Sequence, residues 1–319
     1  MPTELHVAVG VIESPAGEIL IARRAEHSHQ GGLWEFPGGK LEPGESVIEA
    51  LRRELREELA IEVELAAPLL QVRHSYPDRR VLLDVWKVQG FTGQARGAED
   101  QPVRWVPPGE LGNYPFPAAN RPIIAAARLP DRYAILDLAD EDEALMMARL
   151  QALAASGLRM IQLRANALTD AALLRLARPA VTFCRGCGIS LLLNAAPELA
   201  HQLGADGIHL TARRGLSLNR RPLGAEAWVA MSCHNAEELR HAELIGADFA
   251  VLGPVEPTAT HPGVRPLGWR AFRAWVAGVN LPVYALGGMV PAHIPKALEH
   301  GAQGIAGIRG IADDRVGVI

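Results

Sequence analysis

The sequence predicts two domains of different fold class: a mixed α+β layer over residues 1–129, then a (β/α)8 barrel of the α/β class over residues 130–319. The length of 319 residues corresponds to about two typical domains. The first part consists mainly of strand-like runs separated by turn residues. The second part repeats a helix, a glycine and a short apolar strand, which is typical of a parallel sheet covered by helices.

The elements of the first domain follow from the spacing of its apolar and turn residues. A turn at residues 14–17 separates the first two strands, and a loop with two glycine pairs precedes the first helix. We expect strands at 5–12, 18–22, 69–74, 81–88 and 103–106, and helices at 46–59 and 119–128.

A short joint that contains proline, Leu129-Pro130-Asp131, marks the expected domain boundary. After it, four segments share one pattern, in which a glycine ends a helix and an apolar strand follows. These glycines are Gly157, Gly204, Gly246 and Gly301. With further apolar runs they predict eight parallel strands, at 134–138, 160–163, 190–193, 207–210, 228–232, 249–253, 282–286 and 304–308.

Composition and charge argue against several classes of protein. Apolar residues make up 49% and charged residues 21% of the chain, as in ordinary globular proteins. A net charge of -4 argues against a broad surface for nucleic acid. Three cysteines are too few for a disulfide framework, and no apolar run has membrane-spanning length. The start shows no signal-peptide pattern, so we expect a cytoplasmic protein without nucleic-acid or membrane partners.

Acidic residues are concentrated between Lys40 and Glu64. On a helix, Glu54, Glu57 and Glu58 share one face, because they stand at positions i, i+3 and i+4. Three neighbouring carboxylates stay ionised together only beside a divalent cation or several basic groups. Carboxylate oxygens favour Mg²⁺ or Mn²⁺, which keeps coordination positions open for phosphate oxygens and an activated water.

The alternative interpretation of this cluster is a solvated acidic face paired with Arg52, Arg53 and Arg56. For three glutamates alone, that interpretation is the better one. Two glycines before the helix, Gly38 and Gly39, favour the metal site instead, because they let the backbone come close to the ion.

The run from Gly39 to Ile61 resembles the Nudix box, G-x5-E-x7-R-E-U-x-E-E-x-G-U. This resemblance implies the α+β Nudix fold for residues 1–129. One position departs from the pattern, since Ala60 stands where the box has its last glycine. That glycine ends the helix, and a positive φ there would cost an alanine about 0.5–1 kcal/mol. No predicted metal ligand is changed by the departure.

Residues 4–129 are similar to the MutT group of Nudix hydrolases, which convert 8-oxo-dGTP to the monophosphate and pyrophosphate. The similarity rests on Arg23–Ala25, His29, Glu35–Lys40, Tyr76–Arg79 and the segment that starts at Pro117. It implies a metal site made of the Gly38 carbonyl, Glu54, Glu57 and Glu58. The implied catalytic group is Arg53, Glu54, Glu57, Glu58 and Glu99, the last as a further ligand or the base. The implied substrate contacts are Arg24, His29, Glu35, Phe36, Pro37, Gly38 and Asn120.

Asn120 would read the base in this scheme. Guanine has an acceptor at N7, whereas the 8-oxo form has a donor there, so one amide can bond both O6 and N7–H of the oxidised base. Normal dGTP would leave two acceptors facing each other in a buried site. The alternative role of Asn120 is a helix N-cap, which is common for asparagine.

The second half resembles the thiamine phosphate synthase and TenI group over nearly its full length. The similar segments start at Gln162, Gly204, Ser232, Gly253 and Leu286. The resemblance implies a phosphate site near the last strands, where glycine amides such as that of Gly307 could cradle the group. The predicted ligand-site residues are Gln162, Arg164, Thr258, Thr260, Gly287 and Gly288.

The synthase pattern is incomplete in this chain. Asn194-Ala195 stands where the synthases have an Asn-Asp pair. A second metal-binding Asp follows the His-Leu of the fourth strand in the synthases, and here the residues after His-Leu are Thr211-Ala212-Arg213-Arg214. His261 and Asn166 replace two lysines. Without both acids no Mg²⁺ is held to stabilise a pyrophosphate leaving group, so we expect no synthase activity. His234 either transfers a proton, as in TenI-like tautomerases, or merely packs at a helix start.

Two interpretations of function remain open from the sequence. The main one is a Mg²⁺-dependent or Mn²⁺-dependent hydrolase of oxidised purine nucleoside triphosphates, which would take part in DNA repair by cleaning the nucleotide pool. The other is a Nudix hydrolase of thiamine-related pyrophosphates, with the barrel as a ligand sensor or as a module that forms a homodimer.

Overall fold

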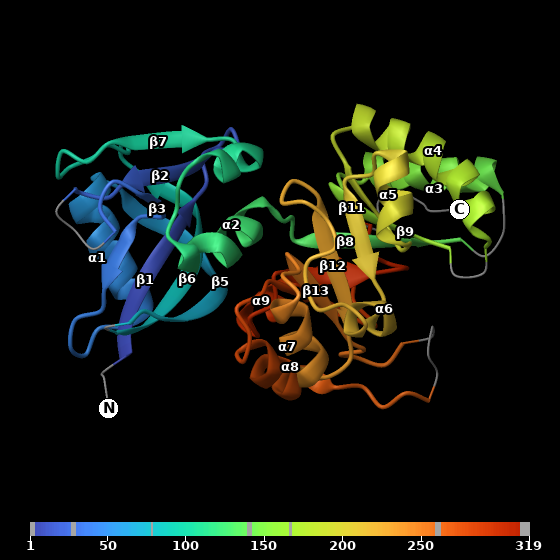
Figure 1. Ribbon diagram of the computed structural model, residues 1–319. Coiled ribbons are helices and arrows are strands. Elements are labelled where there is room, and N and C mark those ends of the chain that lie inside the picture. Colours follow the sequence, from blue (N-terminus) through green and yellow to red (C-terminus); the bar gives the residue numbers. More distant parts are fainter. Residues whose placement is uncertain are drawn as a thin grey trace. The chain divides into compact units, whose positions relative to one another are not determined.

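The computed structural model describes residues 4–26, 30–77, 79–138, 142–165, 168–258 and 263–312. The chain divides into two compact units, Met1–Leu129 and Pro130–Ile319. Figure 1 shows sheets with flanking helices in the first unit and a ring of strands surrounded by helices in the second.

Two sheets form the first unit. One has the order β4-β1-β6-β5, in which β1 and β6 are parallel and the other pairs antiparallel; the other has the antiparallel order β3-β2-β7. The strands are β1 (Glu4–Ile12), β2 (Ile19–Arg23), β3 (Trp34–Glu35), β4 (Gly38–Lys40), β5 (Glu62–Ser75), β6 (Arg80–Thr92) and β7 (Val103–Val106).

Helices pack apolar faces against these sheets. The first, α1 (Val47–Leu59), buries Leu51, Leu55 and Leu59 in one apolar cluster with residues of β1. The second, α2 (Arg121–Arg128), belongs to a separate apolar cluster that also includes β1 residues. Because alternate β1 side chains enter the two clusters, the strand has helices on both of its faces. Two short 3₁₀ helices, η1 (Pro108–Asn113) and η2 (Ala118–Asn120), precede α2.

The expected strands and helices of the first unit are confirmed, but two strands are longer than expected: β5 begins at Glu62 and not at residue 69, and β6 extends to Thr92 and not to residue 88. The sequence missed β3 and β4, which are two and three residues long and contain glycine or a single aromatic residue. Their extended conformation comes from pairing with β2 and β1 and not from local preference.

Both ends of α1 have identifiable caps. Ser46 accepts a hydrogen bond from the Glu49 amide, and Glu49 accepts one from the Ser46 amide at 2.9 Å, which forms a capping box. At the other end, Ala60 has φ 57° and ψ 37°, a left-handed conformation that favours glycine. Ala60, the residue that departs from the motif, therefore adopts a strained backbone conformation.

Replacing Ala60 by glycine should raise the free energy of unfolding of the first unit by about 0.5–1 kcal/mol, because glycine adopts positive φ without steric cost. Chemical denaturation of the full chain measures the change. Ala127→Gly, within right-handed α2, is the matched control and should destabilise the protein. Destabilisation by both substitutions would contradict the assignment of strain to residue 60.

The second unit is a closed barrel of eight parallel strands, in the order β10-β11-β12-β13-β14-β15-β8-β9. All eight expected strands are confirmed, and Gly157, Gly204, Gly246 and Gly301 have positive φ as expected of glycines that end helices. The strands are β8 (Arg132–Asp137), β9 (Met160–Arg164), β10 (Ser190–Leu193), β11 (Gly207–Leu210), β12 (Trp228–Cys233), β13 (Phe249–Leu252), β14 (Val283–Leu286) and β15 (Gly304–Gly307).

Helices follow strands along the barrel, as right-handed crossover connections require. Outward-facing apolar residues of the strands and the inner faces of these helices form one large apolar cluster. The helices are α3 (Glu143–Ala155), α4 (Asp170–Gly186), α5 (Pro197–Leu203), α6 (Ala212–Leu216), α7 (Ala236–Leu244), α8 (Gly268–Val276) and α9 (Ile294–Glu299), with a 3₁₀ turn η3 (Pro291–His293) before α9.

Side chains fill the barrel interior. Tyr133, Phe249 and Tyr284 are fully buried there, and their ring centroids lie 5.3–5.7 Å apart. The interior is therefore packed at the level of these rings, and a ligand can enter only nearer a mouth of the barrel.

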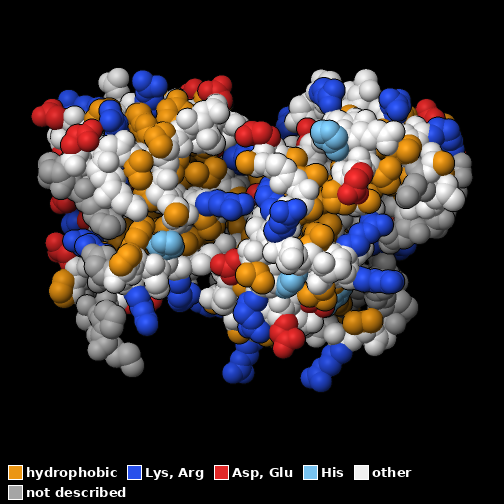
Figure 2. All heavy atoms as spheres, viewed as in Figure 1, with side chains coloured by type: hydrophobic (Ala, Val, Ile, Leu, Met, Phe, Trp, Pro, Cys, Tyr) orange, Lys and Arg blue, Asp and Glu red, His pale blue; other side chains and the backbone are white. Residues whose placement is uncertain are grey.

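None of the helices within the described residues is long and apolar enough to span a bilayer. Lys and Arg side chains are spread over the visible face of the barrel unit (Figure 2), among apolar and acidic ones. This mixed surface agrees with the equal numbers of basic and acidic residues in that half of the sequence.

Candidate active site

Arg53 ties the loop before α1 to the helix. Its guanidinium donates to both oxygens of Glu45, with Nε–Oε1 and Nη2–Oε2 distances of 3.0 Å. It also donates to the Lys40 carbonyl at 3.0 Å and to Glu54 at 2.8 Å, and Glu57 Oε2 lies 3.4 Å away. These hydrogen bonds raise the pKa of the guanidinium, and the bonds to Glu45 make the largest contribution. Arg53 therefore positions the glutamates and does not line the cavity beside them.

Glycine at position 39 is required by the approach of Glu54. A Cβ atom on residue 39 would lie 2.0 Å from Glu54 Cδ and 2.2 Å from Oε1. On the neighbouring residue, Gly38, a Cβ atom would lie 2.1 Å from the Ala8 carbonyl oxygen of β1. The two glycines let β4 pass between β1 and the carboxylates of α1.

Glu58 lies at the centre of the acidic group. It accepts a hydrogen bond from the Gly38 amide at 3.2 Å. Burial raises the pKa of Glu58 to about 8, and the carboxylates of Glu35, Glu54 and Glu99 act in the same direction. The loop that carries Glu99 is held to the end of α1, since the Gln101 amide donates to the Glu58 carbonyl at 2.9 Å.

The described residues do not form a finished metal site, in the sense of three or more His, Cys, Asp or Glu side chains gathered around one point. Glu54 is bound to Arg53, and the Glu57 side chain is 56% exposed. The donor set nevertheless fits a divalent cation. Its oxygens are hard ligands. A cation would offset both the burial and the carboxylate repulsion that together raise the pKa of Glu58. Glu54, Glu57, Glu58 and the Gly38 carbonyl remain the predicted ligands.

A cavity of about 430 Å³ opens beside this acidic group. Glu58, Gly38 and Asn120 all line it, so the residues expected to contact the phosphate chain and the base of a nucleotide share one cavity. The remaining polar and aromatic lining is Arg24, Gln30, Glu35, Phe36, Lys40, Tyr76 and Arg79, and alternate residues of β1 and β6 supply the apolar lining, Leu5, Val7, Val9, Val81 and Leu83.

Asn120 is only 7% exposed and stands immediately before α2. Its side chain makes no capping hydrogen bond to the helix, so the alternative role as an N-cap is not what the structure shows.

Within the same cavity Arg24 forms an ion pair with Glu35. Burial raises the pKa of Glu35, and the neighbouring guanidinium opposes that shift.

Not every predicted residue lies on the cavity. Pro37 is buried, but it contributes its carbonyl as acceptor for the Gly10 amide at 2.8 Å and is not part of the lining. His29 lies outside the described residues. Tyr76 and Arg79 line the cavity although the sequence assigned them no role. Both residues belong to a segment that resembles the MutT group, and this resemblance could have identified them as site residues.

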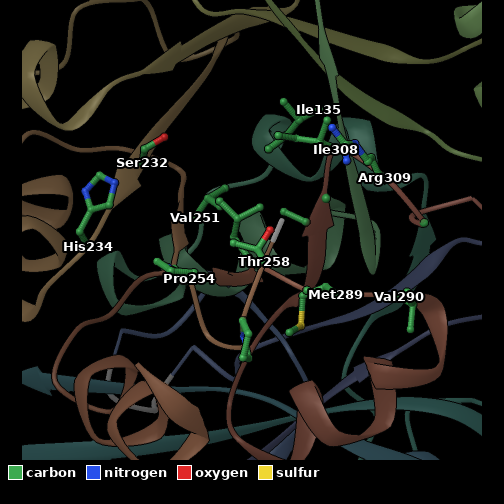
Figure 3. A pocket seen from close by; sticks show the side chains of 18 of the residues that line it. Ile135, Ser232, His234, Val251, Pro254, Thr258, Met289, Val290, Ile308 and Arg309 are labelled. Carbon is green, nitrogen blue, oxygen red and sulfur yellow. The ribbon is translucent and has the colours of Figure 1, made fainter. Parts of the chain in front are cut away.

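The barrel has its own cavity, of about 410 Å³, beyond the carboxyl ends of several strands (Figure 3). Arg164, Thr258, Gly287 and Gly288 line it as predicted, and Gln162 is buried without being part of the lining. Thr260, with His261 and Asn166, lies outside the described residues. Arg164 is engaged by Asp137 through two hydrogen bonds of 2.8 and 2.5 Å.

The residues that replace the synthase acids have structural roles. Ala195 is 2% exposed. Thr211 caps α6, since its hydroxyl accepts a hydrogen bond from the Arg214 amide at 3.2 Å. His234 also lines the cavity, and its Nδ1 lies 2.9 Å from Glu238, whose carboxylate accepts the His234 amide as well.

Comparison with known proteins agrees with the division of the chain into two units. The NUDIX domain family matches residues 8–126, and the thiamine monophosphate synthase family matches residues 132–311. The chain therefore belongs to both families, with a Nudix hydrolase domain in its first unit and a thiamine monophosphate synthase barrel in its second.

Three relatives show how far the similarity extends. The chain is 39% identical over 122 residues to the 8-oxo-dGTP diphosphatase of Escherichia coli, which covers 38% of this chain and 95% of that protein. It is 40% identical over 122 residues to the CTP pyrophosphohydrolase of Escherichia coli, which covers 38% of this chain and 90% of that protein. It is 34% identical over 174 residues to the thiamine-phosphate synthase of Chromobacterium violaceum, which covers 54% of this chain and 84% of that protein.

Gly39→Ala should lower kcat/KM for any nucleotide substrate of the first unit by at least about tenfold, because the added methyl group displaces the Glu54 carboxylate. Steady-state kinetics measures the loss, and circular dichroism reports whether the fold is kept. Gly109→Ala is the matched control, since a Cβ atom there meets nothing within 4 Å. Unchanged activity of Gly39→Ala would show that Glu54 takes no part in catalysis.

Proposed function

We propose that the first unit hydrolyses 8-oxo-dGTP to 8-oxo-dGMP and pyrophosphate with Mg²⁺ or Mn²⁺. The observation that carries the proposal is the buried amide of Asn120, which faces the same cavity as Glu58 and is not used as a helix cap. The identity to an 8-oxo-dGTP diphosphatase over the length of a Nudix domain supports the choice of substrate.

Selectivity for the oxidised base follows from hydrogen-bond polarity. The Asn120 amide offers one acceptor and one donor group, which match N7–H and O6 of 8-oxoguanine. With guanine, N7 is an acceptor and would face the amide oxygen. Because Asn120 is 7% exposed, water cannot restore the lost bond, and the mismatch carries a desolvation penalty.

The chemical step is assigned to the acidic group. Glu54, Glu57, Glu58 and the Gly38 carbonyl would hold the divalent cation, which supplies charge neutralisation for the pyrophosphate and activation of the attacking water. Arg53 keeps Glu54 and Glu57 in place through its bonds to Glu45 and the Lys40 carbonyl.

The wild-type chain should hydrolyse 8-oxo-dGTP with kcat/KM at least about 100-fold higher than for dGTP or CTP. Asn120→Ala should lose most of this preference, because the paired hydrogen bonds to the base are removed. Glu57→Gln should reduce turnover of every substrate by about 100-fold or more, and chelation of divalent cations should abolish it.

Glu64→Gln serves as the control, since Glu64 is an exposed glutamate of β5 outside the cavity. Rapid hydrolysis of CTP with slow hydrolysis of 8-oxo-dGTP would contradict the proposal and favour the activity named for the second Escherichia coli relative. Preference for a pyrimidine pyrophosphate precursor of thiamine would instead favour the thiamine-related alternative.

For the barrel we propose that it lacks thiamine phosphate synthase activity. The support is that neither Ala195 nor any residue of 211–214 offers a carboxylate where the family pattern has acids, and that Thr211 caps α6. A role in ligand sensing or homodimer formation remains the proposed alternative use of the barrel.

An assay with the pyrimidine pyrophosphate and thiazole phosphate substrates should therefore give no thiamine phosphate above the level without enzyme. Product formation by the wild-type chain at a rate comparable to known synthases would overturn the proposal.

A further inference from the structure

The loop 96–101 of the first unit is held on the last turn of α1 by hydrogen bonds to backbone carbonyls. Helix α1 ends at Leu59, so the carbonyls of its last residues have no acceptor role inside the helix. The Ala98 amide donates to the Glu58 carbonyl at 2.8 Å, and the Arg96 amide donates to the Leu59 carbonyl at 3.1 Å. The loop therefore caps the end of the helix that carries the acidic group.

The side chain of Gln101 adds a link that the loop backbone alone does not make. Its Nε2 donates to the same Glu58 carbonyl at 2.9 Å, so this carbonyl accepts two hydrogen bonds from one loop. Its Oε1 accepts a hydrogen bond from the Glu99 amide at 2.9 Å. Both groups of the amide are used, because one partner is an acceptor and the other is a donor. One side chain thus ties the backbone of Glu99 to the backbone of Glu58.

The loop is folded tightly around Gln101. A Cβ atom on residue 97 would lie 1.9 Å from the Gln101 carbonyl oxygen and 3.1 Å from its Oε1, so glycine is required at this position. Asp100 has φ 61°, and this left-handed residue turns the chain between Glu99 and Gln101. The turn lets the Gln101 side chain reach back to the Glu99 amide, and the conformation of residue 99 depends on that contact.

The charge of Glu99 acts on the centre of the acidic group. Burial raises the pKa of Glu58 to about 8, and the nearby carboxylates of Glu35, Glu54 and Glu99 add to that shift. A cation held by Glu58 would be attracted by the Glu99 carboxylate in the same way, because the Coulomb interaction depends only on charge and distance. The position of the Glu99 carboxylate therefore sets part of the affinity for a cation.

We propose that Gln101 is a positioning residue of the first unit, which keeps the Glu99 carboxylate close to the cation that Glu58 would bind. Because this role concerns the same acidic group, it rests on the proposed function of that unit. Gln101 does not line the cavity beside the acidic group, so its effect on a cation passes through Glu99. The amide acts by linking two backbone segments, and the charge that the cation feels is that of Glu99.

Titration of the metal-free full chain with Mn²⁺, without nucleotide, tests the proposal by calorimetry. Glu99→Gln should weaken Mn²⁺ binding by about fivefold, because one nearby negative charge is lost. Gln101→Met keeps the length of the side chain but removes both hydrogen bonds, so it should weaken binding by about threefold as the carboxylate moves away. Gln94→Met is the matched control, since Gln94 is an exposed glutamine of the preceding segment, and it should bind Mn²⁺ like the wild type.

A double variant, Gln101→Met with Glu99→Gln, separates positioning from general support of the helix end. If Gln101 acts through Glu99, its substitution has no further effect on Mn²⁺ affinity once that carboxylate is gone. Gly97→Ala displaces Gln101 by steric contact and should likewise weaken Mn²⁺ binding only where Glu99 is present. Equal weakening in both backgrounds, unchanged affinity of Gln101→Met, or no Mn²⁺ binding by the wild type would each overturn the proposal.

Hydrogen exchange of backbone amides in the metal-free chain follows the loop directly. The Glu99 amide should exchange several-fold faster in Gln101→Met than in the wild type, because its acceptor is removed, and Gln94→Met should leave the rate unchanged. An unchanged rate in Gln101→Met would contradict the proposal. Neither measurement needs a nucleotide, so a failure to hydrolyse 8-oxo-dGTP would refute the proposed function and not the positioning of Glu99.

Discussion

Repulsion between carboxylates beside the Gly38-Gly39 strand is the constraint on which the first unit depends. Burial raises the pKa of Glu58 to about 8, and the nearby carboxylates of Glu35, Glu54 and Glu99 add to that shift. Arg53 neutralises only the side of the helix that faces the loop, through Glu45 and Glu54. The remaining negative charge is retained in a place that suits a cation and the phosphate chain of a nucleotide.

Backbone geometry makes this crowding feasible. Gly39 has no side chain, so the strand that contains it passes within contact distance of the Glu54 carboxylate. The capping box at Ser46 fixes where α1 begins, and thereby sets which face carries the glutamates. The strained Ala60 ends the helix at the point where the motif requires an end, so the cost lies in stability and not in the arrangement of the site.

The barrel has no comparable group of carboxylates at the positions where its family has metal-binding acids. The family's acids are absent at residue 195 and within residues 211–214, while the barrel interior keeps a neutral histidine between two hydroxyl groups. The two units therefore differ in charge, with an excess of acidic residues in the first and equal numbers of acidic and basic residues in the second.

The sequence by itself determined the eight barrel strands, the α1 helix and the shared face of its glutamates, because periodicity and glycine stops are local properties. Only the tertiary structure decided the rest. The strands β3 and β4 exist through pairing with distant strands, and the Asn120 amide faces a cavity instead of capping α2. The Tyr133–His209 bond joins residues 76 positions apart. Burial and hydrogen-bond direction depend on what surrounds a side chain in space, and no local pattern contains that information.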